Sequence, residues 1–311
     1  MDKKILITGG AGFIGSTIAD LFLSSGWDVA VLDDLSSGKR ENVPAGARFY
    51  PCDVRSAAAV EVVVKERPAV ICHEAAQIDV RKSMADPRFD CDVNLGGLLN
   101  LMDAAAKVGS VKQVLFASSG GATYGDTPQI PTREDHPARP LSHYGVAKAA
   151  SELYLGVYQA NFGIPYAALR YANVYGPRQD PHGEAGVVAI FCGRLLERKP
   201  CTINGPGKQT RDYVFVGDVA RANLFAAEKG FAGALNIGTG VETDVNELYA
   251  RLARAAGAEA APLHGPAKPG EQSRSCVDPS AARAALGWKP EVTLDDGLAR
   301  TLAFFRGRMK A

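Results

Sequence analysis

The chain has 311 residues, of which 46% are hydrophobic and 22% are charged. This composition is typical of a globular protein, and the length suggests about two domains. The 35 basic and 34 acidic residues nearly cancel, so no overall field draws the chain to nucleic acid or to an anionic membrane. No apolar run reaches the roughly 18 residues that a membrane span needs. We therefore expect neither nucleic acid nor membrane as a partner.

The six cysteines are scattered, with no C-x-x-C spacing and no paired histidines. This spacing argues against a zinc site and against a disulfide framework, so we expect no metal. Buried cysteines of this kind are typical of a reducing compartment, which predicts a cytoplasmic protein. The cysteines are Cys52, Cys72, Cys91, Cys192, Cys201 and Cys276.

Short apolar runs alternate with longer amphipathic segments through the first half of the chain. We expect strands at 4–8, 28–33, 48–52, 69–73, 111–118 and 165–170. We expect helices at 12–25, 57–65 and 142–161, and a long helical region after residue 73 with 94–107 as its clearest part. The alternation predicts an α/β fold with a doubly wound parallel sheet of the Rossmann type. The strands are apolar with little alternation, as is typical of strands that are covered on both faces.

The pattern changes after about residue 175, where turn-rich segments interrupt shorter strands. Helices are expected there at 244–256 and 294–306, on either side of a Pro- and Gly-rich stretch at 262–270. We interpret residues 1–175 as a cofactor-binding domain and 176–311 as a smaller α/β substrate-binding domain. Part of 211–240 is expected to return to the first domain.

A glycine-rich turn follows the first expected strand and opens the first expected helix. Gly9, Gly12 and Gly15 have the spacing that lets backbone N–H groups approach a pyrophosphate at a helix N-terminus. The second strand then ends in Asp33-Asp34, and an acid at this point can bind the ribose hydroxyls of a dinucleotide. An acid there would repel a 2′-phosphate, so the pattern favours NAD over NADP.

Two basic residues close to this acidic pair, Lys39 and Arg40, would suit NADP instead. A structural strand–helix turn with a surface acid is the alternative to any dinucleotide site. Asp53 follows the third strand and is placed to meet the adenine, although a loop acid explains it as well.

Tyr144 and Lys148 are four residues apart on an expected helix and therefore share one face. A free tyrosine titrates near pH 10, so it is a poor base at neutral pH. A neighbouring ammonium and a cationic nicotinamide would lower the tyrosine pKa and let it take a proton from a hydroxyl group. Ser118 and Ser119 end the preceding strand, where a hydroxyl can bind the reacting oxygen or cap a helix.

These motifs together resemble the extended short-chain dehydrogenase/reductase superfamily, and within it the NAD-dependent sugar-nucleotide epimerases of the UDP-glucose 4-epimerase type. The resemblance covers nearly the whole chain. The segments that carry it are 8–16, 32–43 (LDDLSSGKRENV), 73–81 (HEAAQIDVR), 116–125 (FASSGGATYG), 144–148, 169–180 (LRYANVYGPRQD) and 211–219 (RDYVFVGDV).

The resemblance implies a site for each ligand. Tyr144 would be the base, Lys148 would hold the nicotinamide ribose, and Ser119 would contact the sugar. Together with Tyr144 and Lys148, the cofactor site would be lined by Gly9, Gly12, Phe13, Ile14, Gly15, Asp33, Asp34, Asp53, Val54, Ala75 and Asn94. The UDP-sugar, beyond Ser119 and Tyr144, would be bound by Asn173, Thr202, Asn204, Arg211, Lys268 and Glu271, with Arg274 competing with Lys268.

The implied reaction is epimerisation at C4 of UDP-glucose or UDP-galactose through a 4-keto sugar, in a homodimer. The related 4,6-dehydratases carry an Asp-Glu pair where Gly120-Gly121 stand, so water elimination is disfavoured. In the epimerases that the chain resembles, a residue near Ser275-Cys276 borders the sugar C2 substituent. Both residues are small here, so the resemblance implies that N-acetyl sugars could also fit. The alternatives are a UDP-glucuronate epimerase or decarboxylase, a net reductase, and a non-catalytic NAD-binding regulator.

Overall fold

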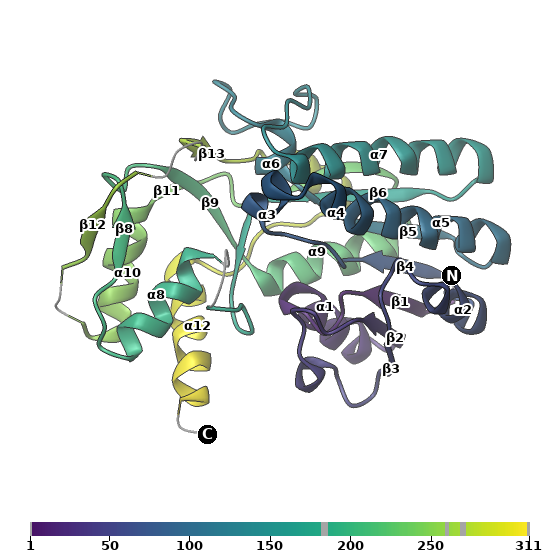
Figure 1. Ribbon diagram of the computed structural model, residues 1–311, viewed down its shortest axis with the longest axis horizontal. Helices are drawn as coiled ribbons and strands as arrows, with labels where there is room; N and C mark the ends of the chain where they lie inside the picture. The colour runs from purple at the N-terminus through teal and green to yellow at the C-terminus, as the bar shows by residue number, and fades with distance from the viewer. Residues whose placement is uncertain (1, 182–185, 259–260, 268–271, 310–311) are drawn as a thin grey trace.

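The computed structural model describes residues 2–181, 186–258, 261–267 and 272–309. Its centre is a seven-stranded sheet in which every neighbouring pair of strands is parallel. The sheet confirms the predicted doubly wound α/β fold (Figure 1). In spatial order its strands are β10 (Gly233–Ile237), β6 (Tyr166–Tyr171), β5 (Gln113–Ser119), β4 (Val70–His73), β1 (Lys4–Thr8), β2 (Asp28–Asp33) and β3 (Arg48–Pro51).

Helices cover both faces of this sheet, and so its central strands are almost wholly apolar. One face packs on α1 (Phe13–Ser24) and α9 (Val216–Lys229), and the other on α2 (Ala57–Glu66), α5 (Gly97–Val108) and α7 (His143–Phe162). Along β1, Ile5 and Ile7 enter the first core and Leu6 the second. The strand order reverses between β1 and β4, and ligands of such sheets bind at the carboxyl ends of the strands near this point.

Helix α7, which carries the predicted Tyr–Lys pair, has clear signals at both ends. The Ser142 side chain accepts a hydrogen bond from the Gly145 N–H, and Gly163 ends the helix with a left-handed φ of 65°. Leu155 and Tyr158 anchor the helix in the core. These contacts fix the rotation of α7, and therefore the direction in which its first turns face.

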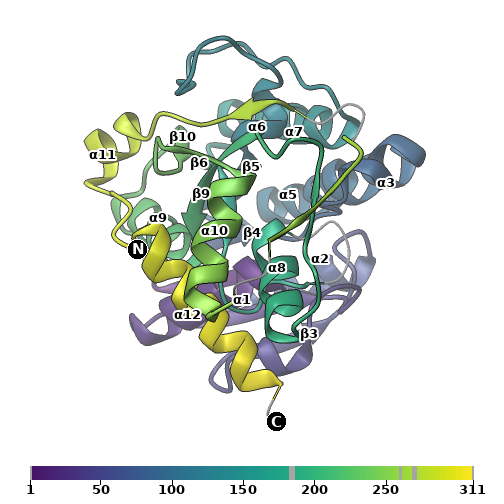
Figure 2. The same ribbon diagram turned by 90° about the vertical axis from the view of Figure 1, so that its left-hand side faces the viewer.

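In the described residues, smaller sheets and three helices of at least ten residues lie beside the large sheet. Strands β11 (Glu242–Asp244), β9 (Thr210–Phe215) and β13 (Arg274–Ser275) lie side by side, with β7 (Asn173–Tyr175) also paired to β9. Strand β8 (Thr202–Asn204) pairs with β12 (Leu263–Gly265). Helices α8 (Val187–Leu196), α10 (Val245–Ala256) and α12 (Leu294–Arg308) pack together around Leu248 and Leu298 (Figure 2).

Most expected helices and strands are confirmed with small differences at their ends. The long helical region predicted after residue 73 consists of α3 (Val80–Ala85), α4 (Pro87–Cys91), the π-helical turn Asp92–Gly96 and α5. The short helices α6 (Gly120–Tyr124) and α11 (Ser280–Leu286) were not expected. Strand β10 and helix α9 lie on the large sheet, although they follow residue 211 in the chain. The division into two domains at residue 175 stays a prediction. Within the described ranges, no helix is long and apolar enough to cross a membrane.

Candidate active site

The glycine turn brings three backbone segments into contact at the end of β1. Gly9 has a left-handed φ of 67°, and a Cβ at this position would lie 2.6 Å from the Ala75 nitrogen. A Cβ at Gly15 would lie only 2.3 Å from the Gly9 carbonyl oxygen. Neither approach leaves room for a side chain, so both positions require glycine.

The same turn leaves the N-terminus of α1 open for an anion. Gly12 precedes the helix and offers no side-chain cap, and the first turn contains no acidic residue. The first N–H groups of the helix, including those of Phe13 and Ile14, have no intrahelical acceptor. Free N–H groups and the positive end of the helix dipole suit a pyrophosphate, so this turn fits the diphosphate of a dinucleotide.

Of the two predicted acids after β2, only one faces the glycine turn. Asp33 is buried and accepts hydrogen bonds from the Ala11 N–H at 3.0 Å and the Leu35 N–H at 2.8 Å. Burial raises the pKa of its carboxyl group, against the lowering effect of these two bonds. Asp34 is exposed and instead binds the Ser36 N–H and hydroxyl. Of the two acids, Asp33 is therefore the one that lies at the glycine turn, and its contact with a ribose stays a prediction.

The predicted adenine-side acid, Asp53, has its own partner within the chain. Both of its oxygens accept from Arg55, and this bidentate pair lowers the Asp53 pKa. Val54 is buried against Gly97, where a Cβ would lie 2.6 Å from a Val54 methyl group. An adenine contact by Asp53 would therefore share its carboxylate with the Arg55 guanidinium.

Asn94 is buried, and its amide group holds the segment after β4. Its oxygen accepts from the Gln77 N–H at 2.9 Å, and its nitrogen donates to the Gln77 carbonyl and to Asp90, both at 3.0 Å. The Asn94 side chain thus fixes the backbone that runs on from Ala75. Asn94 therefore supports the predicted cofactor site indirectly, by holding the backbone at Gln77.

The Tyr–Lys pair lies where α7 passes the carboxyl end of β5. The Lys148 ammonium is buried and donates to the Ala117 carbonyl at 2.8 Å. Its Nζ lies 5.7 Å from the centre of the Tyr144 ring and 4.9 Å from that of Phe116. Burial lowers the Lys148 pKa to about 8 and raises the Tyr144 pKa above its ordinary value. The protein alone therefore does not make Tyr144 a phenolate at neutral pH.

The two serines at the end of β5 have different roles. The Ser118 hydroxyl donates to a Glu152 carboxylate oxygen at 2.6 Å and is buried. The Ser119 hydroxyl accepts from the Ala122 N–H at 3.3 Å, at the start of α6. Because it accepts in this bond, the Ser119 hydroxyl keeps its own hydrogen for a ligand.

A buried ion pair, which the sequence did not reveal, ties these elements together. Arg170 on β6 binds both oxygens of Glu152 on α7, at 3.0 and 2.6 Å. The other side of its guanidinium donates to the Tyr124 hydroxyl of α6 at 2.8 Å. Together with Ser118, this cluster fixes β5, α6, α7 and β6 relative to one another. The sequence signal for this ion pair is Glu152, an acid four residues after Lys148 and therefore on the same helical face.

The predicted nucleotide contacts lie on the smaller sheets. Arg211 on β9 is partly exposed, and its guanidinium binds the Thr210 carbonyl at 2.8 Å. Asn173 begins β7, which pairs with the same strand, and is exposed. Thr202 and Asn204 bracket the buried Ile203 on β8. The predicted pair Lys268 and Glu271 lies outside the described residues.

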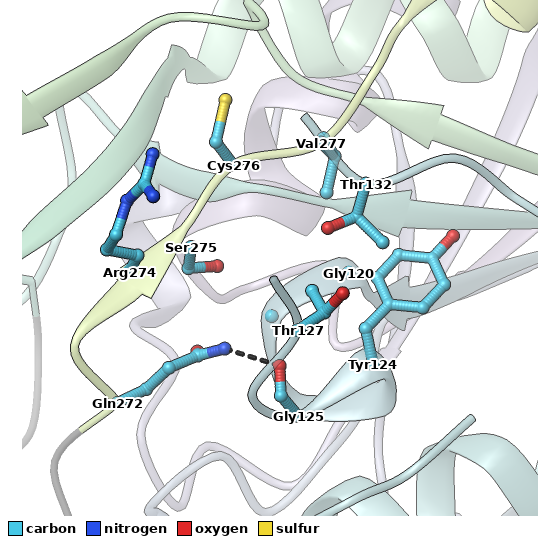
Figure 3. Close-up of a pocket in the computed structure, with 11 residues that line it drawn as sticks. Gly120, Tyr124, Gly125, Thr127, Thr132, Gln272, Arg274, Ser275, Cys276 and Val277 are labelled. Carbon is cyan, nitrogen blue, oxygen red and sulfur yellow. Dashed lines mark hydrogen bonds between the residues drawn. The ribbon is translucent and has the colours of Figure 1, made fainter. Parts of the chain in front are cut away.

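A narrow pocket lies between α6 and β13, and in this structure it has no room for a water molecule (Figure 3). The Ser275 hydroxyl faces Gly121, where a Cβ would lie 2.9 Å away, whereas Cys276 points away and is buried. Both small residues expected near the sugar line this pocket, but only the Ser275 side chain points towards α6. Arg274, at the rim of the pocket, pairs with Glu242.

The comparison with known families decides what kind of site this is. Residues 5–238 match the family described as "NAD dependent epimerase/dehydratase family". The chain belongs to this family. The UDP-glucose 4-epimerase of Mycolicibacterium smegmatis is 45% identical over 311 residues, which cover 98% of this chain and 99% of that enzyme.

Solved structures of similar proteins agree with this membership of the epimerase/dehydratase family. The UDP-glucose 4-epimerase of Thermotoga maritima, solved with UDP-glucose, is 44% identical with a TM-score of 0.96, over 98% of this chain and 99% of that one. The enzyme of Thermus thermophilus, solved with NAD, is 45% identical with a TM-score of 0.92, over the same shares. The resemblance to sugar-nucleotide epimerases and the NAD prediction are confirmed.

Within this family fold, the structure brings the glycine turn, Asp33 and Ala75 together at the carboxyl ends of β1, β2 and β4. Asp53 and Val54 follow β3, and the Tyr–Lys pair lies on α7. Gly9 touches Ala75, and Asp33 meets Ala11 of the glycine turn. The individual roles of the predicted residues stay predictions. Sequence reasoning missed Glu152 and Arg170, and it also missed Glu74, a carboxyl group at the end of β4.

Proposed function

We propose that the chain interconverts C4 epimers of a UDP-sugar, with UDP-glucose and UDP-galactose as its first substrates. The observation that carries this proposal is the buried Lys148 ammonium beside Tyr144, at the edge of the sheet that also holds the glycine turn. The same edge presents the Ser119 hydroxyl. One edge of the sheet thus carries a base, a hydroxyl donor and a turn that fits a dinucleotide. These are the groups that oxidation and re-reduction of a secondary alcohol require.

In this proposal the chain moves a proton at the sugar O4. Tyr144 accepts it as C4 is oxidised and returns it when the sugar has turned to present its other face. Lys148 stabilises the phenolate, and Ser119 donates to the same oxygen. NAD, when bound, supplies the hydride acceptor and a positive ring charge that favours the phenolate further. Burial raises the Tyr144 pKa, and a positive charge beside the ring would oppose that shift.

The sugar must turn while its nucleotide stays bound, so binding should concentrate on UDP. We propose that Arg211 and Asn173 hold the diphosphate, because they lie on paired strands β9 and β7. An arginine fork matches phosphate oxygens well. Thr202 and Asn204 are proposed to meet the uridine, and Lys268 with Glu271 to bind the UDP.

Replacing Tyr144 with phenylalanine tests the proposed base. We expect Tyr144→Phe to lower kcat by about 10² to 10⁴-fold, the usual contribution of general acid–base catalysis, with bound NAD unchanged. Tyr154→Phe, an exposed tyrosine on the same helix, is the matched control and should keep its activity. Near-normal turnover of Tyr144→Phe would refute the assignment.

The small side chain of Ser275 beside Gly121 supports a second substrate class, UDP sugars with an N-acetyl group at C2. Relative rates on UDP-glucose and UDP-N-acetylglucosamine measure this preference. Release of CO₂ from UDP-glucuronate would instead identify a decarboxylase. Net oxidation of the reduced cofactor would identify a reductase.

We also propose that two copies of the chain pair through α7. Val146, Leu153 and Val157 are 50%, 76% and 54% exposed, and their spacing places them on one helical face. A second copy would cover this stripe in a four-helix bundle with α5. Leu153→Glu should give a monomer by light scattering, whereas Val64→Glu, at an equally apolar exposed position on α2, should not. A Leu153→Glu protein that still runs as a dimer would contradict the proposal.

The six free cysteines support a cytoplasmic location, which cell fractionation would test.

A further inference from the structure

Glu74 is a carboxyl group in the catalytic region to which the proposed mechanism gives no role. It follows β4 directly, and its backbone N–H donates to the Thr8 carbonyl at 3.2 Å, next to the glycine turn. His73 pairs in register with Phe116, so Glu74 lies one position further, beside Ala117. Ala117 is the residue whose carbonyl holds the Lys148 ammonium. The sheet register therefore brings Glu74 to the strand end that Lys148 occupies.

The carboxylate is fastened in place from two other elements. Its Oε1 accepts from the Tyr171 hydroxyl of β6 at 2.8 Å, and that hydroxyl accepts from the Asn223 amide of α9 at 2.7 Å. The Cys72 thiol lies 3.6 Å from the same carboxylate oxygen. Glu74 thus reaches from β4 past β5 to β6, and its side chain is not free to turn towards solvent.

Glu74 has the strongest effect on Lys148 among the acids that face this lysine. Burial lowers the Lys148 pKa, while Glu74, then Asp90 and Glu152, raise it. Glu152 is neutralised by Arg170, and Asp90 accepts from Gln77. Glu74 has no such cationic or amide partner in the described part of the chain.

The remaining titratable groups in this region are neutral near pH 7. Burial lowers the His73 pKa to about 3 and raises the pKa of Cys72, Tyr144 and Tyr171. Burial raises the pKa of Glu74 itself to about 7, while its bond from Tyr171 and the charge of Lys148 lower it. The charge state of this cluster therefore depends mainly on Glu74 and Lys148.

We propose that Glu74 is a positioning residue whose carboxylate, held by Tyr171, is the counter-ion of the buried Lys148 ammonium. This inference rests on the proposed roles of Tyr144 and Lys148. Its consequence is that Glu74 acts on the reaction through Lys148: without the carboxylate, the ammonium loses its proton at lower pH, and Tyr144 then loses the charge that favours its phenolate.

The test follows the titration of Lys148 directly, by NMR of the NAD-bound protein labelled with ¹³C at lysine Cε. The Lys148 signal is assigned by its loss in Lys148→Met. We expect Glu74→Gln to lower the pH midpoint of Lys148 by about one unit or more, the usual effect of losing one nearby opposite charge. Glu61→Gln, the same change at an exposed site on α2, should leave the midpoint unchanged.

A second variant keeps the proposal testable if Glu74→Gln does not fold. Tyr171→Phe removes the hydrogen bond that lowers the Glu74 pKa, so less of the carboxylate is ionised near neutral pH. The Lys148 midpoint should then fall in the same direction by a smaller amount. An unchanged midpoint in either variant would overturn the proposal.

Kinetics give an independent readout of the same effect. The alkaline limb of the wild-type kcat profile should lie near pH 8, where Lys148 deprotonates, and should move to lower pH in Glu74→Gln with little change in KM. A profile that does not move would contradict the inference. Because the NMR titration needs no turnover, a failure of the proposed epimerase activity would remain distinguishable from a failure of the Glu74 assignment.

Discussion

The glycine turn after β1 and the strand β13 beside α6 both form walls of the proposed site, but they are built differently. At the turn, backbone meets backbone, and a Cβ at Gly15 would lie 2.3 Å from a carbonyl oxygen. Beside α6, a Cβ at Gly121 would meet the Ser275 hydroxyl, the end of a side chain that can rotate. The cofactor wall therefore permits almost no change of sequence, whereas the substrate wall can vary and so set substrate preference.

Gly15→Ala should have the largest effect, because its Cβ cannot be accommodated without moving the turn. We expect less than about a tenth of the normal NAD content and a clearly lower Tm, since a backbone clash costs several kcal/mol. Bound NAD is measured by release from the denatured protein. Gly307→Ala is the matched control, because a Cβ there meets nothing within 4 Å. Normal NAD content in Gly15→Ala would show that the turn is not rigid.

The two serines at the end of β5 compare a hydroxyl that is free to bind a ligand with one that binds within the protein. Ser119→Ala should lower kcat by about 10²-fold through loss of a donor to the reacting oxygen, and loss of its cap on α6 should cost about 1 kcal/mol of stability. Ser118→Ala should cost a similar amount of stability, because Glu152 loses a buried donor, but should leave kcat nearly unchanged. The kcat values of the two variants therefore separate the two roles. The reverse pattern would assign the catalytic hydroxyl to Ser118.

On the substrate side, two arginines compete for the diphosphate. Arg211→Ala should raise KM for the UDP-sugar by about tenfold or more, because a charged hydrogen bond contributes roughly 1.5–3 kcal/mol. Arg274→Ala should change KM less, since Arg274 is exposed and paired with Glu242. Steady-state kinetics on both variants decide between them. A larger effect at Arg274 would move the diphosphate to β13.

Gly121→Ala should have the smallest effect, because a Cβ there would meet a side chain and not backbone. Alanine favours the helix by about 0.5–1 kcal/mol, and the Ser275 side chain can rotate away. We expect a small change in Tm and less than about a tenfold change in kcat/KM. Gly120→Ala is the contrast, because its Cβ would lie 2.6 Å from a buried Val277 methyl group. Equal stability of both variants would contradict the expectation that α6 accepts a Cβ at Gly121 more easily than at Gly120.

The dinucleotide-binding fold and NAD could be predicted from the sequence because their signals are local. The glycine spacing, the acid ending β2 and the i,i+4 pair on α7 each lie within a short segment. The Glu152–Arg170 pair and the contact of Glu74 with Tyr171 could not be predicted, because they join residues that only the sheet brings together.

Two other features show why further details escaped prediction. Helix α6 has five residues, two of them glycines, so it shows no helical periodicity. Ser118 and Ser119 are chemically identical, and only the alternation of β5 decides which hydroxyl turns towards Glu152. The roles of neighbouring polar residues thus depended on the orientation of a strand that sequence alone did not fix.

The most direct test of the account is proton NMR of the purified protein incubated with UDP-glucose and, separately, with UDP-N-acetylglucosamine, with no NAD added. The account predicts that the corresponding galacto sugar forms, that the faster substrate reveals the C2 preference, and that the bound NAD is unchanged at the end. No conversion of either sugar by protein whose bound NAD has been confirmed would contradict it.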